Sequence, residues 1–112
     1  MFDYDSKNDL LYLFNPAKKS KGSIEFGELV IDLEKKGEIT GIEIFDASKY
    51  LSELTSRKIS KKALKELENA SFTCSNRKGT VIIKITLTTP LEKILAPLAI
   101  QDLNYKSPLI AR

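Results

Sequence analysis

The segment ITGIEIFDASKYL, residues 39–51, changes from a strand pattern to a helix pattern within a few positions. The side chains of residues 39–45 alternate in the pattern of a β-strand, and the isoleucines of this segment are placed to fill a core. At Asp46-Ala47-Ser48 the period changes, because apolar side chains then follow at helical spacing. We expect the side chain of Asp46 or Ser48 to cap a short helix that begins there.

The strand at 39–45 is predicted to be the second half of a hairpin. Its turn is Glu34-Lys35-Lys36-Gly37-Glu38, where Gly37 can adopt a positive φ. Upstream of this hairpin, the alternation between Ser23 and Leu33 changes phase, which predicts a β-bulge or bend at Gly27. Two further strand-like runs, residues 2–5 and 10–14, are joined by a polar turn, and a Lys-rich loop follows them.

The second half of the chain predicts another helix and another hairpin. Ser60 can cap a helix whose Ile59 packs on Leu64. Residues 80–88 form the most regular strand, after a strand around Cys74. Beyond Pro90 the pattern is ambiguous, with a helical turn over 91–94 and a strand over 98–105 as the readings.

These elements predict one α+β domain over residues 1–112. We expect a curved antiparallel sheet of about six strands built from hairpins, with the central helical segment packed on one face. Residues 1–55 form the β-meander and helix start, and residues 56–112 form a helix and β-hairpin extension. A chain of this length can bury about two-thirds of its unfolded surface, which is enough for one core.

Composition narrows the class of protein. Apolar residues make up 42% and charged residues 29% of the chain, which is typical of a globular protein. The acidic start Met1-Phe2-Asp3-Tyr4-Asp5 does not resemble a secretory signal, the longest apolar run is too short to span a bilayer, and the single cysteine cannot form an internal disulfide. We expect a cytoplasmic protein with no membrane partner. High Ile, Leu, Lys and Glu usage is also common in heat-adapted proteins.

Charge is distributed unequally between the two halves. Residues 1–55 hold seven Lys and eleven Asp or Glu, whereas residues 56–112 hold eleven Lys or Arg and four acids. Such asymmetry can mark a surface for nucleic acid, or it can attract the two halves to each other or to a neighbouring subunit. The densest basic set, a possible anionic-partner patch that could equally be a solvated face, is Arg57, Lys58, Lys61, Lys62, Lys65, Arg77 and Lys78.

The residue types exclude several kinds of catalysis. Without histidine, Ser-His and Cys-His pairs and every histidine-containing metal site are impossible, and one cysteine cannot build a thiolate cage. We expect Cys74 to be buried as a small apolar residue. Asp3, Asp5 and Asp9 fail the calcium-loop pattern, and the single, dispersed glycines form no phosphate loop. We predict no catalytic, cofactor-binding or metal-binding residues; the cross-hairpin acids Asp32 and Glu43 receive no role.

The first half resembles the prokaryotic domain-of-unknown-function family 2283. The resemblance is carried by Tyr4-Asp5, Asp9, Leu11-Tyr12, Val30-Ile31-Asp32, Gly37, Gly41-Ile42-Glu43-Ile44 and Asp46-Ala47-Ser48. It implies a small protein with a β-meander and a helix, and it brings no established catalytic residue. Some members lie beside toxin-like genes, which implies a protein-binding or antitoxin-like role.

The expected function is therefore that of a non-enzymatic, self-associating protein-interaction module of the antitoxin-like kind. We expect a homodimer, because open sheet edges and the apolar segment from Leu91 to Ile110 invite a second copy. The alternative is a weak nucleic-acid-binding protein that uses the basic second half.

Overall fold

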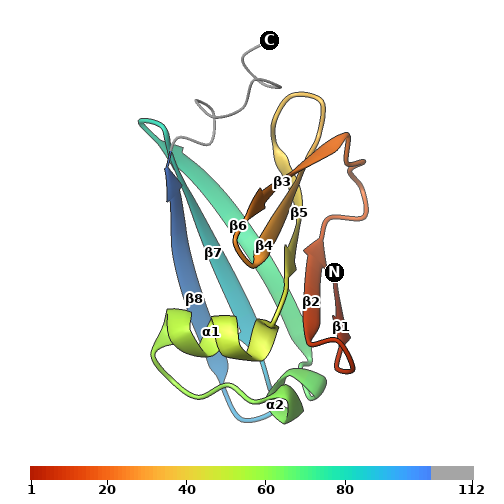
Figure 1. Ribbon diagram of the computed structural model, residues 1–112, viewed down its shortest axis with the longest axis vertical. Helices are drawn as coiled ribbons and strands as arrows, with labels where there is room; N and C mark the ends of the chain where they lie inside the picture. The colour runs from red at the N-terminus through yellow and green to blue at the C-terminus, as the bar shows by residue number, and fades with distance from the viewer. Residues whose placement is uncertain (102–112) are drawn as a thin grey trace.

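Eight β-strands are divided between two antiparallel sheets that pack against each other across a shared apolar core (Figure 1). The computed structural model describes residues 1–101. In chain order the elements are β1 Phe2–Asp5, β2 Leu10–Phe14, β3 Gly22–Phe26, β4 Leu29–Leu33, β5 Ile39–Ile44, α1 Ala47–Thr55, α2 Lys61–Lys65, β6 Asn69–Arg77, β7 Thr80–Thr88 and β8 Lys93–Gln101. The strand orders are β1-β2-β5-β4-β3 and β6-β7-β8.

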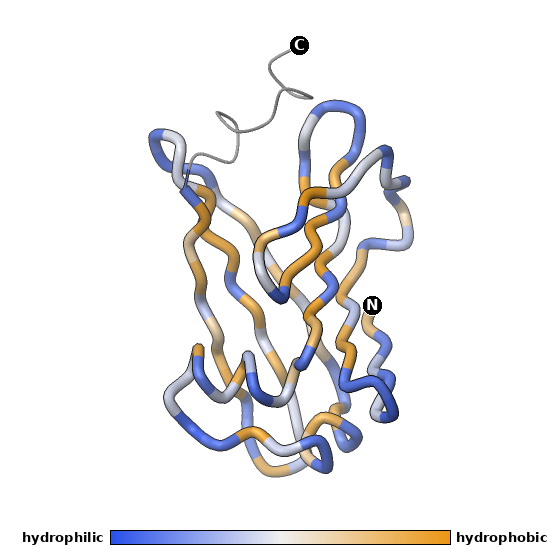
Figure 2. The backbone as a smooth tube through the Cα atoms, viewed as in Figure 1, coloured by the Kyte–Doolittle hydropathy of each residue, from blue (hydrophilic) through white to orange (hydrophobic). Residues whose placement is uncertain are grey.

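The core forms because one face of each sheet is apolar. In the five-stranded sheet, the side chains that point inward include Leu11, Ile31 and Ile42, none of which is exposed. In the three-stranded sheet, the odd positions of β7 and the even positions of β8 are buried in the same way. Figure 2 shows the resulting alternation of hydrophobic and hydrophilic residues along the strands. Period-two patterns thus place apolar side chains between the sheets and polar ones outside.

The two helices follow β5 and lead into the second sheet. Helix α1 contacts β8 and buries Ala47 and Leu51. Helix α2 begins at Ser60, whose side chain accepts a hydrogen bond from the Ala63 backbone amide at 3.1 Å, while the predicted staple residue Ile59 is buried. No helix within residues 1–101 has the length and apolar character needed to cross a membrane.

The prediction of an antiparallel α+β fold is confirmed, but the single sheet of about six strands is wrong in detail. A sheet of five strands and a sheet of three form instead, because β6, β7 and β8 pair only with one another. Of the two predicted alternatives at Gly27, the chain bends there and forms no bulge: Gly27 has φ +57° and lies in the tight turn between β3 and β4. That turn reverses the chain and so changes the phase of the alternation, whereas the register shift lies between Asp32 and Leu33 of β4.

The hairpin across Glu34–Glu38 is confirmed, with Gly37 at φ +88°. In the C-terminal part, the predicted helical turn over 91–94 is wrong, since residues 93–94 belong to β8, whereas the predicted strand is confirmed for residues 98–101 and begins earlier, at Lys93. The rest of the predicted 98–105 strand and of the apolar 91–110 segment lies outside the described residues.

Candidate functional site

A buried carboxylate, Asp9, ties the β1–β2 turn to the start of α1. It accepts hydrogen bonds from the Tyr4 hydroxyl at 2.6 Å, the Ser48 hydroxyl at 2.6 Å and the Ser48 backbone amide at 3.2 Å. The Asp9 carbonyl also accepts from the Ala47 amide at 2.9 Å. Asp9 therefore caps helix α1 through Ser48, which lies 39 residues further along the chain.

This remote cap replaces the local cap that the sequence predicts. Asp46 has φ +50° and makes no side-chain hydrogen bond to the helix, and Ser48 donates to Asp9 instead of capping the helix itself. Burial raises the pKa of Asp9, but the hydrogen bonds from Ser48 and Tyr4 outweigh burial and hold that pKa below its usual range. The ionised Asp9 is thus a structural anchor.

A second polar cluster lies on the outer face of the five-stranded sheet. Asp32 of β4 is only 6% exposed, and it accepts hydrogen bonds from the Tyr12 hydroxyl at 3.2 Å and the Ser23 hydroxyl at 2.9 Å. Gly41 makes room for this arrangement, since a Cβ there would lie 3.0 Å from the Asp32 carboxylate and 3.1 Å from the Tyr12 ring. A glycine is therefore needed opposite Asp32 in the ladder.

Glu43 completes this cluster beside Tyr12, its cross-strand partner. Burial, together with the negative charge of Asp32, raises the pKa of Glu43. Burial and the same two carboxylates also raise the pKa of the Tyr12 hydroxyl. Asp32 and Glu43 therefore differ in their surroundings, and neither of them lines any of four clefts formed by residues 1–101.

The whole outer face of the five-stranded sheet is acidic. Its carboxylates, which alternate with the core residues of β1, β3, β4 and β5, are Asp3, Asp5, Glu25, Asp32 and Glu43. No Lys or Arg shares this face, because the strand positions between the acids are Leu, Tyr, Phe, Ser, Val and Gly. Tyr12 and Phe14 of β2 stack on this face, with ring centroids 4.7 Å apart. We call this surface the acidic face.

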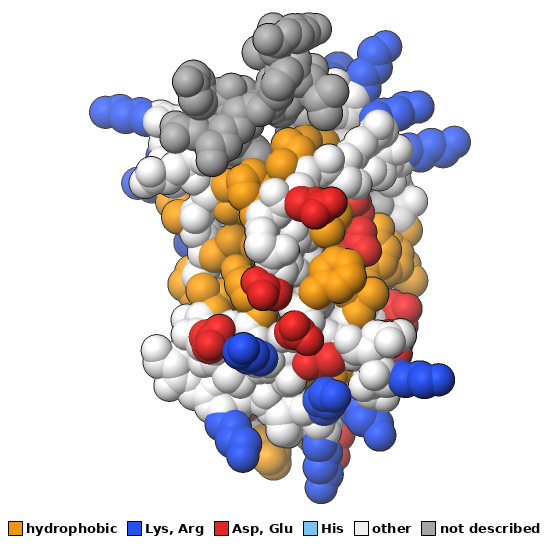
Figure 3. All heavy atoms as spheres, viewed as in Figure 1, with side chains coloured by type: hydrophobic (Ala, Val, Ile, Leu, Met, Phe, Trp, Pro, Cys, Tyr) orange, Lys and Arg blue, Asp and Glu red, His pale blue; other side chains and the backbone are white. Residues whose placement is uncertain are grey.

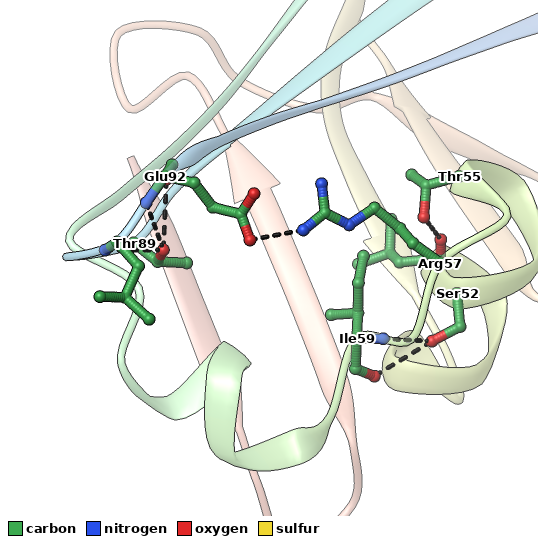
Figure 4. Close-up of polar contacts among 8 residues, drawn as sticks. Ser52, Thr55, Arg57, Ile59, Thr89 and Glu92 are labelled. Carbon is green, nitrogen blue, oxygen red and sulfur yellow. Dashed lines mark hydrogen bonds and ion pairs between the residues drawn. The ribbon is translucent and has the colours of Figure 1, made fainter.

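The basic set predicted from sequence is divided between the two ends of the molecule. Lys58, Lys61, Lys62 and Lys65 lie at or next to α2, whereas Arg77 and Lys78 lie at the far end of β6, a nine-residue strand that spans about 30 Å. Arg57 is paired with Glu92 in the β7–β8 turn (Figure 4). These residues therefore form no single patch.

Sequence reasoning missed a different basic cluster, which three loops bring together. The β2–β3 loop, the β4–β5 turn and the β6–β7 turn lie at one end of the molecule, and Figure 3 shows Lys and Arg side chains extending from both upper corners there. Their charged residues are Lys18, Lys19, Lys21, Glu34, Lys35, Lys36, Glu38, Arg77 and Lys78. Lys18 pairs with Glu38 at 2.7 Å. We call this cluster the basic loop end.

Other candidate chemistry finds little support in the described part of the chain. The prediction that Cys74 is buried is wrong, since the residue is exposed on β6. Although Cys74 is exposed, atoms crowding its thiol limit access of water and raise its pKa to about 11, which disfavours the thiolate. Within residues 1–101, no three His, Cys, Asp or Glu side chains gather in a way that could hold a metal ion.

The two polar clusters around Asp9 and Asp32 both lie within residues 1–48. Residues 1–48 match the family "Protein of unknown function (DUF2283)". The DUF2283 segment is the five-stranded sheet together with the first residues of α1, and it ends at Ser48, which donates to Asp9. The predicted resemblance of the first half is therefore confirmed.

Two curated relatives match part of the chain. Uncharacterized protein MJ0789 of Methanocaldococcus jannaschii is 38% identical over 50 residues, which are 45% of this chain and 43% of the relative. A protein named putative hypoxanthine phosphoribosyltransferase, from Methanosarcina mazei, is 36% identical over 47 residues, which are 42% of this chain and 38% of the relative. The chain spans about two-fifths of the length of these curated relatives. No solved structure matches the chain.

The structure explains why several residues in the DUF2283 segment are needed for folding, but the match itself assigns no activity. Tyr4 and Asp9 anchor helix α1, and Tyr12, Asp32 and Gly41 build the polar cluster of the acidic face. The family has no assigned function, and the enzyme name of one relative belongs to that relative.

Proposed function

We propose that this protein is a non-enzymatic interaction module that binds a basic protein partner through the acidic face. The observation that carries the proposal is the segregation of charge: the outward strand positions of one sheet hold five carboxylates, of which Asp32 is nearly buried, and no Lys or Arg. Charge of one sign on an open face steers a partner of the opposite sign and sets the specificity of the encounter.

The opposite net charges of residues 1–55 and 56–112 do not produce salt bridges between these two segments in the described part of the chain. The salt bridges Lys18–Glu38 and Arg57–Glu92 each lie within one half, and among residues 1–101 none joins the acidic half to the basic half. The contact between the two sheets is apolar instead. This leaves the acidic face available to a partner.

The stacked pair Tyr12 and Phe14 supports the same surface. Both rings are half-buried, so a partner would cover an aromatic pair that has carboxylates beside it. Aromatic residues are enriched at the centres of protein interfaces, where polar rims surround them. In an antitoxin-like role, such a face would cover the basic surface of a nucleic-acid-binding partner.

Affinity capture from the native host tests this proposal. The bait is the tagged full chain, compared with Asp3→Asn/Glu25→Gln/Glu43→Gln on the acidic face and with Lys84→Gln/Lys93→Gln on the opposite sheet. Asp32 is left unchanged because its hydrogen bonds support the fold. We expect a basic protein that the wild type and the lysine variant capture, and that the acidic-face variant captures at least tenfold less. Equal capture by all three baits contradicts the proposal.

Weak nucleic-acid binding is a second candidate, supported by the seven Lys or Arg against two Glu at the basic loop end. Fluorescence anisotropy against single-stranded and duplex DNA and RNA at two salt concentrations tests it. Binding should weaken steeply with salt and fall in Lys19→Gln/Lys36→Gln/Lys78→Gln. The α2 variant Lys61→Gln/Lys65→Gln is the matched control. Salt-insensitive binding, or no binding, contradicts this candidate.

A further inference from the structure

Three of the four sheet edges carry features that keep another strand from adding. The edge strand β1 is four residues long and has two aspartates, and β3 is five residues long with Glu25 at an outward position. Strand β8 has Pro97 near its middle. Short length, charge and proline are the usual protections of an exposed edge.

The fourth edge strand, β6, contacts β1 and β2 but has none of these protections within residues 1–101. It is nine residues long, it contains no proline, and its first charged residue is Arg77 at its end. Every residue from Thr73 to Arg77 is exposed. A long, uncharged edge of this kind presents unpaired backbone groups to another strand.

The β6–β7 turn identifies which backbone groups are unpaired. Lys78 and Gly79 both have positive φ, +50° and +86°, as a type I′ two-residue turn requires. The flanking pair Arg77 and Thr80 then exchanges both of its hydrogen bonds, and alternate residues of β6 do the same with β7. The residues between them, including Cys74 and Asn76, direct their N–H and C=O groups away from the sheet.

The same register explains the protection of β8. The backbone N–H and C=O of Lys84 in β7 form hydrogen bonds with Thr73 of β6. Pro97, which lies opposite Lys84 on β8, therefore directs its backbone groups toward the free edge of β8. Pro97 has no N–H there, and strand addition on β8 loses a donor. Cys74 occupies the corresponding kind of position on β6 but keeps its N–H.

Two adjoining clefts run beside the free edge of β6. One, of about 350 Å³, is lined by Cys74, Ser75 and Asn76 of β6, and its apolar residues include Ile39 of β5, Phe72 of β6 and Val81, the β7 partner of Asn76. The other, of about 260 Å³, continues it past Ser71 and shares Ile39 and Phe72 with the first. An added strand would find space for its side chains on this side of the sheet.

The charge around these clefts indicates what the strand would carry. The larger cleft lies at the basic loop end, where Lys18 and Glu38, which pair with each other, both line it. Arg77 and Lys78, which follow Asn76 directly, supply the excess positive charge. An acidic residue at that end of the strand complements this charge. The apolar cleft residues favour apolar side chains at alternate positions.

We infer that the free edge of β6 binds an extended strand of a protein partner, with apolar side chains at alternate positions and an acidic residue next to the basic loop end. About five residues of strand, roughly 17 Å, match the exposed part of β6. This surface is separate from the acidic face, so it can be tested without reference to the proposed function.

A displayed library of random 12-residue peptides tests this inference on the full chain. Peptides selected on Cys74→Ala are compared for binding to Cys74→Pro, which removes the outward N–H as Pro97 does on β8 and leaves the β6–β7 ladder intact. Thermal unfolding and amide spectra of β7 check that both variants fold. In parallel, hydrogen exchange of the wild type with a selected synthetic peptide reads the Cys74 and Asn76 amides directly and does not depend on the proline variant.

We expect selected peptides with alternating apolar residues and an acidic end, at least tenfold weaker binding to Cys74→Pro, and slower exchange at Cys74 and Asn76 when the peptide binds. Three results overturn the inference. The first is a library that yields no binder. The second is a set of binders that interact equally with both variants and leave the exchange of these amides unchanged. The third is a free wild type that forms a dimer abolished by Cys74→Pro, in which case a second copy occupies the edge.

Discussion

Replacing Asp9 with asparagine should destabilise the protein far more than the same replacement at Asp46. Both residues have positive φ, +52° and +50°, which asparagine tolerates, so backbone strain is matched. Asp9 accepts hydrogen bonds from three donors, whereas Asp46 makes no side-chain bond to the helix. An amide replaces one acceptor oxygen with a donor and removes the charge.

The magnitude follows from these contacts. Hydrogen bonds to a charged group contribute about 1.5–3 kcal/mol net, and a helix cap contributes about 1 kcal/mol. Since asparagine keeps one acceptor oxygen, we expect Asp9→Asn to cost about 2 kcal/mol of unfolding free energy, or roughly 8 °C in Tm for a chain of this size. Asp46→Asn should stay within about 0.5 kcal/mol of the wild type.

Denaturant and thermal unfolding at pH 7 measure this difference, and a pH series checks its origin. The folded-state pKa of Asp9 is lowered from its ordinary value of 3.8, so its stabilisation is fully present above that value. The stabilisation is lost as the pH falls through the lowered pKa. Equal losses for the two variants at pH 7, or an Asp9→Asn loss that persists unchanged at pH 2, would refute the remote cap.

Four further outcomes are expected. Gly41→Ala should cost about 1–3 kcal/mol in denaturant unfolding, since its Cβ meets Asp32 and backbone at close range, and an unchanged midpoint counts against the glycine's role. Thr40→Val should raise stability by about 1 kcal/mol, because the buried Thr40 hydroxyl has no hydrogen-bond partner among residues 1–101; a lower Tm contradicts this. Glu43→Gln should stabilise the fold at pH 7 but not at pH 4. The folded-state pKa of Glu43 is raised above its ordinary value of 4.5, so ionisation of Glu43 lowers the stability of the wild type as the pH rises above 4.5. A loss of stability in Glu43→Gln at pH 7 contradicts this prediction. Alkylation of Cys74, followed by mass spectrometry, should be slow at pH 7 and accelerate up to about pH 11, and fast reaction at pH 7 contradicts the raised pKa.

The parts of the fold that depend on neighbouring residues can be predicted from the sequence. The turn at Glu34–Glu38 follows from Gly37, and the start of α2 follows from Ser60, since each signal lies within four residues of its effect. The strand β7 is equally clear because its alternation is regular over nine residues.

Features that join distant segments could not be predicted in this way. Nothing near Asp9 indicates that its carboxylate caps helix α1 through Ser48, 39 residues away, and a local cap at Asp46 or Ser48 satisfies the same sequence rules. The division into two sheets depends on which strand edges meet after the helices. A turn at Gly27 and a bulge there produce the same change of phase.

The charged surfaces show the same limit. The basic residues between positions 57 and 78 are close in sequence and suggest one patch, but strand β6 separates Arg77 from α2. The basic loop end needs three turns to meet, and the acidic face needs four strands to align in register. The closest sequence signal for both is the excess of acids in residues 1–55 and of bases in residues 56–112, and this signal gives no position in space.

The central functional claim is that a basic partner binds the acidic face. Its most direct measurement is an amide chemical-shift titration of the isotope-labelled full chain with the captured partner. The largest chemical-shift changes should fall on Tyr12, Val30 and Glu43, which lie in one row across β2, β4 and β5. Added salt should reverse these changes. Largest shifts on the outer positions of β7 and β8, or on α2, would contradict the claim.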